Sequence, residues 1–253
     1  MKIVRFDDRG TARFGSLEGD RITPLEGTID ALKPSGDAAV ALGATRLLAP
    51  AAPGKIVAIG LNYADHAAEG KRELPQEPML FIKPSTAVIG PGDEIIYPPQ
   101  TANLHHEGEL AIVIGRTARQ VSEAEARRYV LGYTCANDVT ARDLQRRDVQ
   151  FTRGKGFDTF APLGPWIVTD LDPSDLALET RVNGAVRQKS RTSHLIFSCD
   201  YLVSFISHVM TLLPGDVIST GTPAGVGPML VGDVVEVEIE KIGCLRNRIA
   251  APR

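Results

Sequence analysis

The sequence is poor in cysteine and contains no long apolar run. Its three cysteines, Cys135, Cys199 and Cys244, are odd in number, far apart and form no CxxC pair, so we expect neither a disulfide framework nor a thiolate zinc site. No apolar stretch approaches the roughly 20 residues of a membrane-spanning helix. The first residues become charged too early for a secretory signal peptide. We therefore expect a cytoplasmic protein that does not contact a membrane.

The sequence also lacks an excess of positive charge. Its formal net charge is −3, which argues against a non-specific nucleic-acid binder, since such a protein needs a basic surface. The glycine-rich stretch at 219–227 lacks the GK[ST] ending of a phosphate-binding loop, so nucleotide binding is not expected either. With 43% hydrophobic and 23% charged residues, the composition is that of an ordinary globular protein and indicates neither disorder nor a fibre.

The pattern of turns and strands divides the chain into two parts. Residues 1–52 have the pattern of a small β module, whose strands are expected at 2–6, 12–17 and 21–25 because turn-forming residues separate them. The proline- and alanine-rich stretch at 49–54 is typical of a linker. We therefore predict a small N-terminal β module at 1–52 and a main domain at 53–253.

In the main domain, strands outnumber helices. A serine and a glutamate at 122–125 form the pattern of a capping box, and apolar residues at helical spacing predict a helix over 198–213, ended by a Pro-Gly pair. Residues 110–115 and 233–241 predict strands, the second with regular alternation. Because the helices are interspersed irregularly, we predict a mixed, β-rich α+β fold rather than a doubly wound sheet.

Two glutamates at the start of the first strand are candidate metal ligands. Residues two apart on a strand share a face, so Glu107 and Glu109 should lie side by side, with Cα atoms roughly 7 Å apart. Asp138, an acid in an apolar setting, is a candidate third ligand. Carboxylate oxygens suit Mg²⁺ or Mn²⁺. The alternative is a solvated strand face, since the glutamates at 236, 238 and 240 have the same spacing and are expected to face solvent.

A histidine and a glutamate three residues apart follow the predicted strand at 55–60. On a helical turn His66 and Glu69 would be neighbours, and a carboxylate beside an imidazole makes a base that can activate water. The alternative is a solvated pair on a surface helix. The polar, proline-containing segment 70–78 that follows is a candidate lid.

Further polar residues can face the same site. Arg142 and Gln145 are three apart on an expected helix after Asp138. Lys155 lies between two glycines, where its ammonium could approach a bound anion, although most such lysines are solvated. The glycine-rich turn at 219–227 offers backbone amides and a hydroxyl to a carboxylate.

Taken in order along the chain, these segments resemble the fumarylacetoacetate hydrolase family. The matching pieces are GLNYADH with Glu69, FIKPSTA, LHHEGELAIVIG, YTCANDVTARDLQ, GKGFDTFAPLGPW and STGTPAGVG, and they cover about residues 55–240. Any one of them is weak evidence, whereas their common order is specific. The chain differs from the long fumarylacetoacetase branch in having no acidic residue between 56 and 62. It is more similar to the short bacterial branch of acylpyruvate hydrolases, oxaloacetate decarboxylases and 2-hydroxyhepta-2,4-diene-1,7-dioate isomerases.

The resemblance implies a roll-like, β-rich catalytic domain that is usually a homodimer. It implies Mg²⁺ or Mn²⁺ held by the three acids, with His66 and Glu69 as the water-activating pair. Lys155 would be catalytic, and the substrate contacts would come from the following residues: Arg142, Gln145, Thr222, Gly221 and Lys83. The expected substrate is a small 2-oxo carboxylic acid.

The resemblance leaves three hypotheses for the activity. The first is metal-dependent hydrolysis of a C–C bond in an acylpyruvate-type 2,4-dioxo acid, through an enolate that the metal stabilises. The second is decarboxylation of oxaloacetate or isomerisation of a 2-hydroxy-diene dioate at the same site. The third is a metal-binding protein without catalytic activity.

Overall fold

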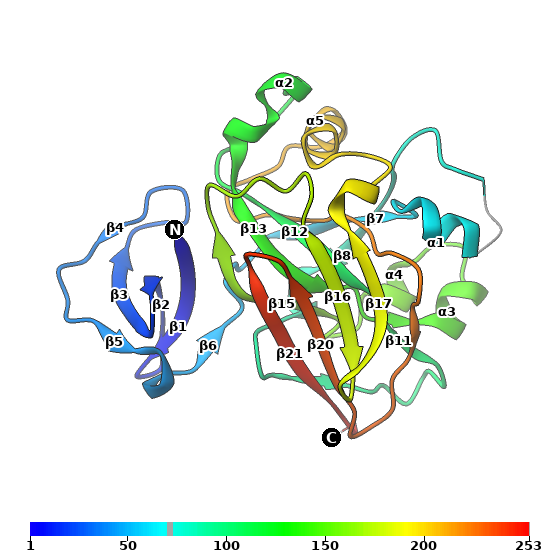
Figure 1. Ribbon diagram of the computed structural model, residues 1–253, viewed down its shortest axis with the longest axis horizontal. Helices are drawn as coiled ribbons and strands as arrows, with labels where there is room; N and C mark the ends of the chain where they lie inside the picture. Colours follow the sequence, from blue (N-terminus) through cyan, green and yellow to red (C-terminus); the bar gives the residue numbers. More distant parts are fainter. Residues whose placement is uncertain (70–72, 253) are drawn as a thin grey trace.

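The structure is a computed structural model that describes residues 1–69 and 73–252. Residues 70–72, in the segment predicted as a lid, lie outside the described residues. Strands dominate the fold, and short helices lie at its periphery (Figure 1). The prediction of a mixed, β-rich α+β fold is confirmed. None of the helices in the described part of the chain has the length and apolarity that crossing a membrane requires.

The described strands form sheets of 13, 5 and 3 strands. Along its main path the large sheet has the order β4 (Lys33–Pro34), β3 (Arg21–Glu26), β2 (Thr11–Glu18), β1 (Lys2–Asp8), β15 (Ala161–Val168), β13 (Val130–Asn137), β12 (Gly108–Ile114), β18 (Val217–Ser219), β7 (Lys55–Gly60) and β8 (Met79–Pro84). Three further strands pair beside this path: β5 (Val40–Ala41), β6 (Leu47–Leu48) and β9 (Val88–Ile89).

The five-stranded sheet packs against the large one, since Val237 lies in one apolar cluster with Leu110, and the three-stranded sheet packs against the five-stranded one, since Leu104 clusters with Val235. The five-stranded sheet has the order β10 (Glu94–Ile96), β21 (Gly243–Ala250), β20 (Val234–Ile239), β16 (Ala177–Val182) and β17 (Ala185–Arg191). The three-stranded sheet has the order β14 (Thr140–Ala141), β11 (Leu104–His106) and β19 (Gly227–Pro228).

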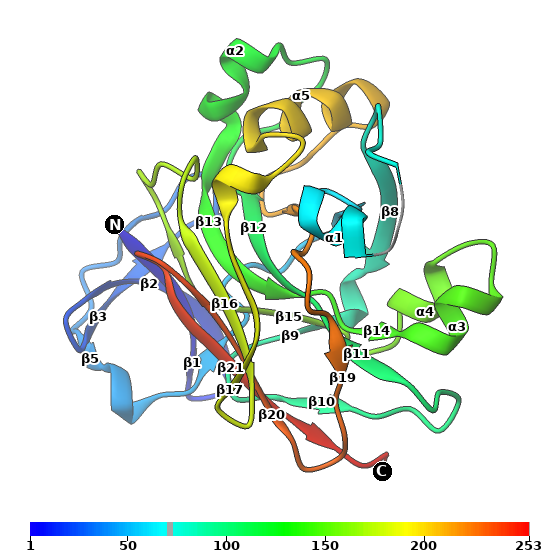
Figure 2. The same cartoon turned by 45° about the vertical axis from the view of Figure 1, so that its right-hand side comes forward.

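The helices are short apart from α5. They are α1 (Ala64–Glu69), α2 (Glu123–Ala126), α3 (Arg142–Arg147), α4 (Thr152–Lys155) and α5 (Cys199–Val209), together with single 3₁₀ turns η1 (Leu42–Ala44), η2 (Ser85–Ala87), η3 (Arg127–Tyr129) and η4 (Thr192–His194). Turned by 45°, the molecule shows α1, α3 and α4 on the same side as β8 (Figure 2). This side carries the candidate site.

The N-terminal strands join the large sheet. Strand β1 pairs with β15, Ile3 lying opposite Ile167, and the module lies to one side of the main body (Figure 1). The stretch predicted as a linker is packed rather than free, because Ala49 and Ala51 are buried in an apolar cluster with Ile3. Burial of these small side chains fixes the approach of the module to the main domain.

Strand β12 is buried on both faces. Leu110, Ile112 and Ile114 pack into one apolar cluster with residues of β20 and α5. Ala111 and Val113 pack into a second cluster on the other face. Each buried branched side chain contributes about 1.5–3 kcal/mol of burial free energy. Strand β12, which carries Glu109, is therefore held in place by packing on both faces. A rigid strand is a precise support for a site.

Two local predictions need correction. The helix α5 ends at Val209, not at residue 213, because Met210 is already extended and Leu212 instead exchanges backbone hydrogen bonds of 2.9 Å with Ala118. The capping box at α2 does not form, since the Ser122 hydroxyl donates to the Glu125 carboxylate at 2.9 Å and caps no backbone amide.

Candidate functional site

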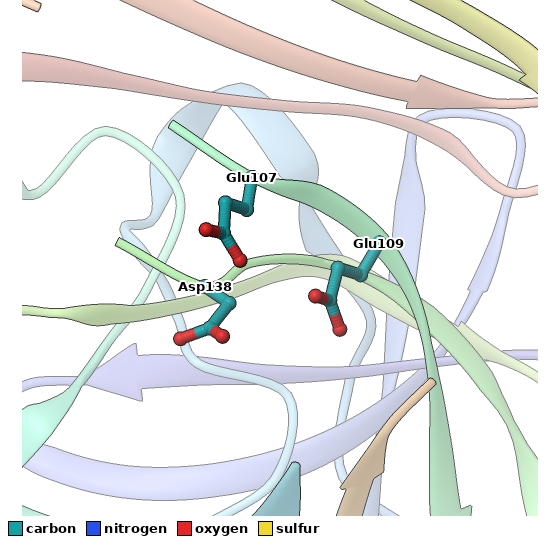
Figure 3. Close-up of side chains that lie close together, drawn as sticks. All are labelled: Glu107, Glu109 and Asp138. Atoms are coloured by element: carbon teal, nitrogen blue, oxygen red, sulfur yellow. The ribbon is translucent and has the colours of Figure 1, made fainter. Parts of the chain in front are cut away.

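The three candidate acids come together at one end of β12 and β13. Glu107 immediately precedes β12, Glu109 lies within it, and Asp138 immediately follows β13. The antiparallel register places Glu109 opposite Ala136, and the Asp138 N–H donates to the Glu107 carbonyl oxygen at 2.8 Å. All three side chains are buried, and one oxygen of each lies within 4.8 Å of the others. Their carboxylates converge on one space (Figure 3), so the alternative of a solvated strand face does not apply to them.

Glu109 has only neutral hydrogen-bond donors. The Ser219 hydroxyl donates to its Oε2 at 2.5 Å and the Gly221 N–H donates to the same oxygen at 2.9 Å. No lysine or arginine among the described residues lies within ion-pair distance of it. Burial, followed by the charges of Asp138 and Glu107, raises the pKa of Glu109 to about 8. A nearby cation would stabilise the charged form of such a carboxylate more than that of a carboxylate already paired with a lysine or arginine.

Glu107 and Asp138 are already close to cations. The Lys155 Nζ donates to Glu107 Oε2 at 2.8 Å and to Asp138 Oδ2 at 2.5 Å, and Arg142 forms an ion pair with Glu107. Burial opposes the charged forms, but Lys155 and Arg142 outweigh it and hold the pKa of Glu107 below its ordinary value. In the same way burial acts to lower the pKa of Lys155, and the charges of Asp138 and Glu107 outweigh it and raise that pKa. Lys155 is therefore a buried ammonium, not the solvated lysine of the alternative.

Two residues predicted as substrate contacts, Lys83 and Gly221, bind two of the three acids in the structure. Lys83 is buried, forms an ion pair with Asp138 and donates to the Val139 carbonyl oxygen at 3.1 Å. Burial lowers the pKa of Lys83, against the attraction of Asp138. Gly221 uses its N–H for Glu109. Its φ of +100° is a conformation that suits glycine, and a Cβ there would lie 2.7 Å from the Cβ of Asn62. Neither residue is among those that line the cavity beside the acids.

The donor set fits a hard divalent cation. Three buried carboxylates offer the oxygen ligands that Mg²⁺ and Mn²⁺ prefer, and Glu109 is the member for which the surrounding protein supplies no paired positive charge. Glu107 and Asp138 share one positive group, the ammonium of Lys155, which pairs with both. A cation between the three would relieve the repulsion that raises the pKa of Glu109.

A cavity of about 590 Å³ opens beside the acids. Its lining residues come from β7, α1, β8, β11, α3 and α4 and from the loops around them: Ile59, Gly60, Leu61, His66, Glu69, Met79, Phe81, His105, Glu107, Arg142, Gln145, Arg146, Phe151, Lys155, Thr222 and Val226. A volume of this size accommodates a small-molecule substrate.

The predicted histidine–glutamate pair lines this cavity. His66 Nδ1 lies 3.3 Å from Glu69 Oε2 on α1, and the Gly225 N–H lies 3.3 Å from the Glu69 carboxylate. Glu69 therefore links α1 to the loop at 220–226. With Nδ1 facing the carboxylate, His66 has Nε2 available for a proton.

Arg142 and Gln145 both lie on α3, as their spacing predicted, and line the cavity. Arg142 donates to the Gln145 side-chain oxygen as well as to Glu107. Thr222 also lines the cavity. Its hydroxyl donates to the Gly108 carbonyl oxygen at 2.9 Å and accepts from Gln188 Nε2 at 2.7 Å. The cavity thus brings together residues from distant segments.

Sequence reasoning missed the residues that support the site from behind. Ser219 lay within a recognised segment, but only the pairing of β18 with β12 shows that its hydroxyl reaches Glu109. Gln188 lies on β17, outside every segment singled out, and bonds both Gly108 and Thr222. The aromatic residues Phe81 and Phe151, with ring centroids 5.6 Å apart, were also missed. Their positions depend on tertiary packing.

Comparisons with known proteins match nearly the whole chain. The family model "Fumarylacetoacetate (FAA) hydrolase C-terminal" matches residues 55–250, and the model "Rv2993c-like, N-terminal" matches residues 1–50. The chain is 42% identical to a 2,4-didehydro-3-deoxy-L-rhamnonate hydrolase of a Sphingomonas species, over 99% of this chain and 96% of that protein. It is 44% identical to a mitochondrial oxaloacetate tautomerase of Bos taurus, over 78% and 67% of the two chains.

Solved structures of proteins named as an isomerase and a hydrolase are also similar to this chain over all or most of its length. A 5-carboxymethyl-2-hydroxymuconate delta-isomerase of Mycobacterium smegmatis is 49% identical, with a TM-score of 0.94 and full coverage of both chains. A fumarylpyruvate hydrolase of Pseudomonas aeruginosa, solved in complex with Mn²⁺ and pyruvate, is 35% identical with a TM-score of 0.76, over 79% of this chain and 91% of that one.

Proposed function

The chain belongs to the fumarylacetoacetate hydrolase family of enzymes, and from this premise we propose that it is a metal-dependent hydrolase of acylpyruvate-type 2,4-dioxo acids. Members similar to it include a hydrolase, an isomerase and a tautomerase. The proposal selects C–C hydrolysis among these reactions. Its main support is that the buried acids, a buried ammonium and a histidine–glutamate pair adjoin one cavity.

Glu107, Glu109 and Asp138 would hold Mg²⁺ or Mn²⁺. When bound, such a cation supplies Lewis acidity that stabilises negative charge developing on a substrate oxygen. The similar fumarylpyruvate hydrolase was solved with Mn²⁺. The charged Lys155 at the Glu107–Asp138 side of the acids adds a second positive group, and its raised pKa keeps it protonated at neutral pH.

His66 would act as the base for the attacking water. Its Nε2 takes a proton from water while Glu69 orients the ring and stabilises the imidazolium. The water oxygen bonds to the C4 carbonyl carbon of the substrate, and the C3–C4 bond then breaks. The electron pair remains on C3 as the enolate of pyruvate, which accepts a proton, and the other product is a carboxylic acid. Arg142 and Lys155 lie where they favour the anionic product.

The experiment that tests this function is a metal-controlled assay on defined substrates. Purified protein is treated with chelator, then assayed with and without Mn²⁺ on acetylpyruvate and fumarylpyruvate, with release of pyruvate as the measurement. We expect no turnover without metal and recovery with Mn²⁺. Full activity in chelator, or no pyruvate release with any metal, would refute the proposal.

The second candidate is a reaction without a water nucleophile. The 49% identity to a delta-isomerase and the 44% identity to an oxaloacetate tautomerase favour it. Isomerisation, tautomerisation and decarboxylation of 2-oxo acids all proceed through an enol or enolate, which the same acids and Lys155 would serve. Assaying oxaloacetate and a 2-hydroxy-diene dioate beside the two acylpyruvates ranks these activities directly.

Two organisational expectations stay predictions. One is the division into an N-terminal module at 1–52 and a catalytic domain at 53–253, and the other is a homodimer. Light scattering coupled to size exclusion measures the molar mass of the assembly and tests the second. A mass of one chain, 27.2 kDa, would contradict it.

A further inference from the structure

Among the described residues that line the cavity, all charged side chains but one are paired. Glu107 pairs with Arg142 and Lys155, and Glu69 pairs with His66. Arg146 lines the same cavity but forms no ion pair or hydrogen bond with any residue of the described part of the chain. It is an exposed residue on α3. We propose that Arg146 binds a second carboxylate of the substrate, so that the preferred substrate is a dicarboxylate.

Arg146 lies on α3 and lines the cavity on the same side as Arg142. Residues four apart on a helix lie on the same face, so Arg146 stands one turn beyond Arg142. Both side chains line the cavity, but Arg142 pairs with Glu107, whereas no acidic side chain of the described residues lies within ion-pair distance of Arg146. The result is a positive end of the cavity that an anion would neutralise.

An apolar wall adjoins the buried acids and α4. The Phe81 and Phe151 rings pack edge to face, with centroids 5.6 Å apart, and the Lys155 ammonium lies 5.1 Å from the Phe81 ring centroid. Phe151 directly precedes α4, which packs against α3. A substrate with its 2-oxo acid group at the acids and Lys155 would lay its carbon chain on these rings. Its second carboxylate would then reach α3.

This inference rests on the proposed function and makes it more specific. It favours 2,4-dioxo acids of the fumarylpyruvate type over monocarboxylates such as acetylpyruvate. The competing possibility is that Arg146 is a solvated arginine at the cavity rim that contacts no substrate. The two possibilities differ in one quantity, which is the change in preference between a dicarboxylate and a monocarboxylate when Arg146 is replaced.

The test compares Arg146→Gln, Arg146→Lys and wild type, all loaded with Mn²⁺, on fumarylpyruvate and acetylpyruvate. The control is Arg147→Gln, because Arg147 is the next residue on α3, is exposed and does not line the cavity. A lost charge-assisted hydrogen bond predicts that Arg146→Gln lowers the ratio of kcat/KM for fumarylpyruvate to that for acetylpyruvate by about 10- to 100-fold. The loss should appear mainly in KM. Arg146→Lys should recover part of it, since lysine keeps the charge but not the planar fork.

Three results are decisive. A selective loss in Arg146→Gln with no change of the ratio in Arg147→Gln supports the proposal. An unchanged ratio in Arg146→Gln, or an equal change in both variants, overturns it. If wild type hydrolyses neither compound, the proposed hydrolysis is wrong, and the role of Arg146 is then decided by calorimetry with the same two intact compounds as ligands. In that case an unchanged ratio of their Kd values in Arg146→Gln overturns the proposal.

Discussion

The backbone N–H of Asp138 donates a hydrogen bond of 2.8 Å to the carbonyl oxygen of Glu107. Two acids far apart in sequence are thus tied together by main chain and not only by their side chains. The strand pairing of β12 with β13 continues up to this bond. Because the backbone holds these two residues side by side and both side chains are buried, the repulsion between their carboxylates has to be offset by Lys155, which pairs with both, or by a bound cation.

Cation affinity should depend on pH through Glu109. The pKa of this residue is raised to about 8 in the metal-free protein, and the cation binds the carboxylate form. Affinity for Mn²⁺ should therefore rise with pH, by up to about tenfold per unit below pH 8, and level off above it. Calorimetry in buffers of different ionisation enthalpy should show close to one proton released per ion at pH 7. Glu109→Gln should bind more weakly and lose this slope. A pH-independent affinity in wild type would contradict the account.

His66 should matter for hydrolysis more than for enolate chemistry alone. Loss of a general base lowers rates by roughly 10²–10⁴-fold, so His66→Ala should lower kcat on acylpyruvates by this order. Tautomerisation of oxaloacetate should fall much less, since it needs no water nucleophile. The matched control is His208→Ala, an exposed histidine outside the cavity. Equal losses on both reactions in His66→Ala would show that His66 has no special role toward water.

Lys83 should stabilise the metal-free protein. Its ammonium and the Asp138 carboxylate are each about 1% exposed, and removal of one partner of a buried ion pair costs about 3–5 kcal/mol. Lys83→Met should lower the free energy of unfolding by this amount in chelator, as measured with denaturant. Adding Mn²⁺ should raise the free energy of unfolding of Lys83→Met by more than it raises that of wild type, because the cation gives Asp138 a new positive neighbour.

The control for Lys83 is Lys55→Met. Lys55 forms an ion pair with the buried Asp216, away from the acids. Its loss should destabilise the protein without any added effect of Mn²⁺. If both variants respond to Mn²⁺ alike, Lys83 and the cation do not share Asp138, and the arrangement of charges proposed here is wrong.

Gln188 should couple the strand that carries the acids to the loop that carries Thr222. Its Oε1 accepts the Gly108 N–H at 3.0 Å and its Nε2 donates to Thr222 Oγ1 at 2.7 Å. Gln188→Leu should cost about 1–3 kcal/mol for each group left unpaired and lower kcat/KM, because Thr222 loses its orientation. Asn247→Leu removes an equally buried amide that bonds Gly90 and Asp93, remote from the cavity. It should lower stability at unchanged kcat/KM. Equal kinetic effects in both variants would refute the coupling.

Local patterns predicted the parts of the site that depend on spacing. Alternation along β12 placed Glu107 and Glu109 on one side, and helical spacing placed Arg142 beside Gln145. The same alternation on β20 predicted solvent exposure for Glu238, which is indeed exposed and pairs with Arg181. Spacing is identical on the two strands. What distinguishes them is burial, because β12 lies between two apolar clusters while the outer face of β20 does not.

The sequence could not reveal contacts between segments without a shared pattern. The ion pair between Lys83 and Asp138 joins β8 to the residue after β13, and no pattern within either segment indicates it. The helix expected up to residue 213 ends early, since Leu212 finds backbone partners in Ala118. In each case the deciding partner lies in a distant part of the chain, and no local propensity encodes it.

The most direct test of the account is the position of bound Mn²⁺. Anomalous diffraction from crystals of the protein grown with Mn²⁺ would locate the ion independently of any assay. The account predicts one strong peak about 2.0–2.3 Å from an oxygen of each of Glu107, Glu109 and Asp138. Absence of a peak between these three carboxylates at saturating Mn²⁺, or a peak held by other residues, would contradict it.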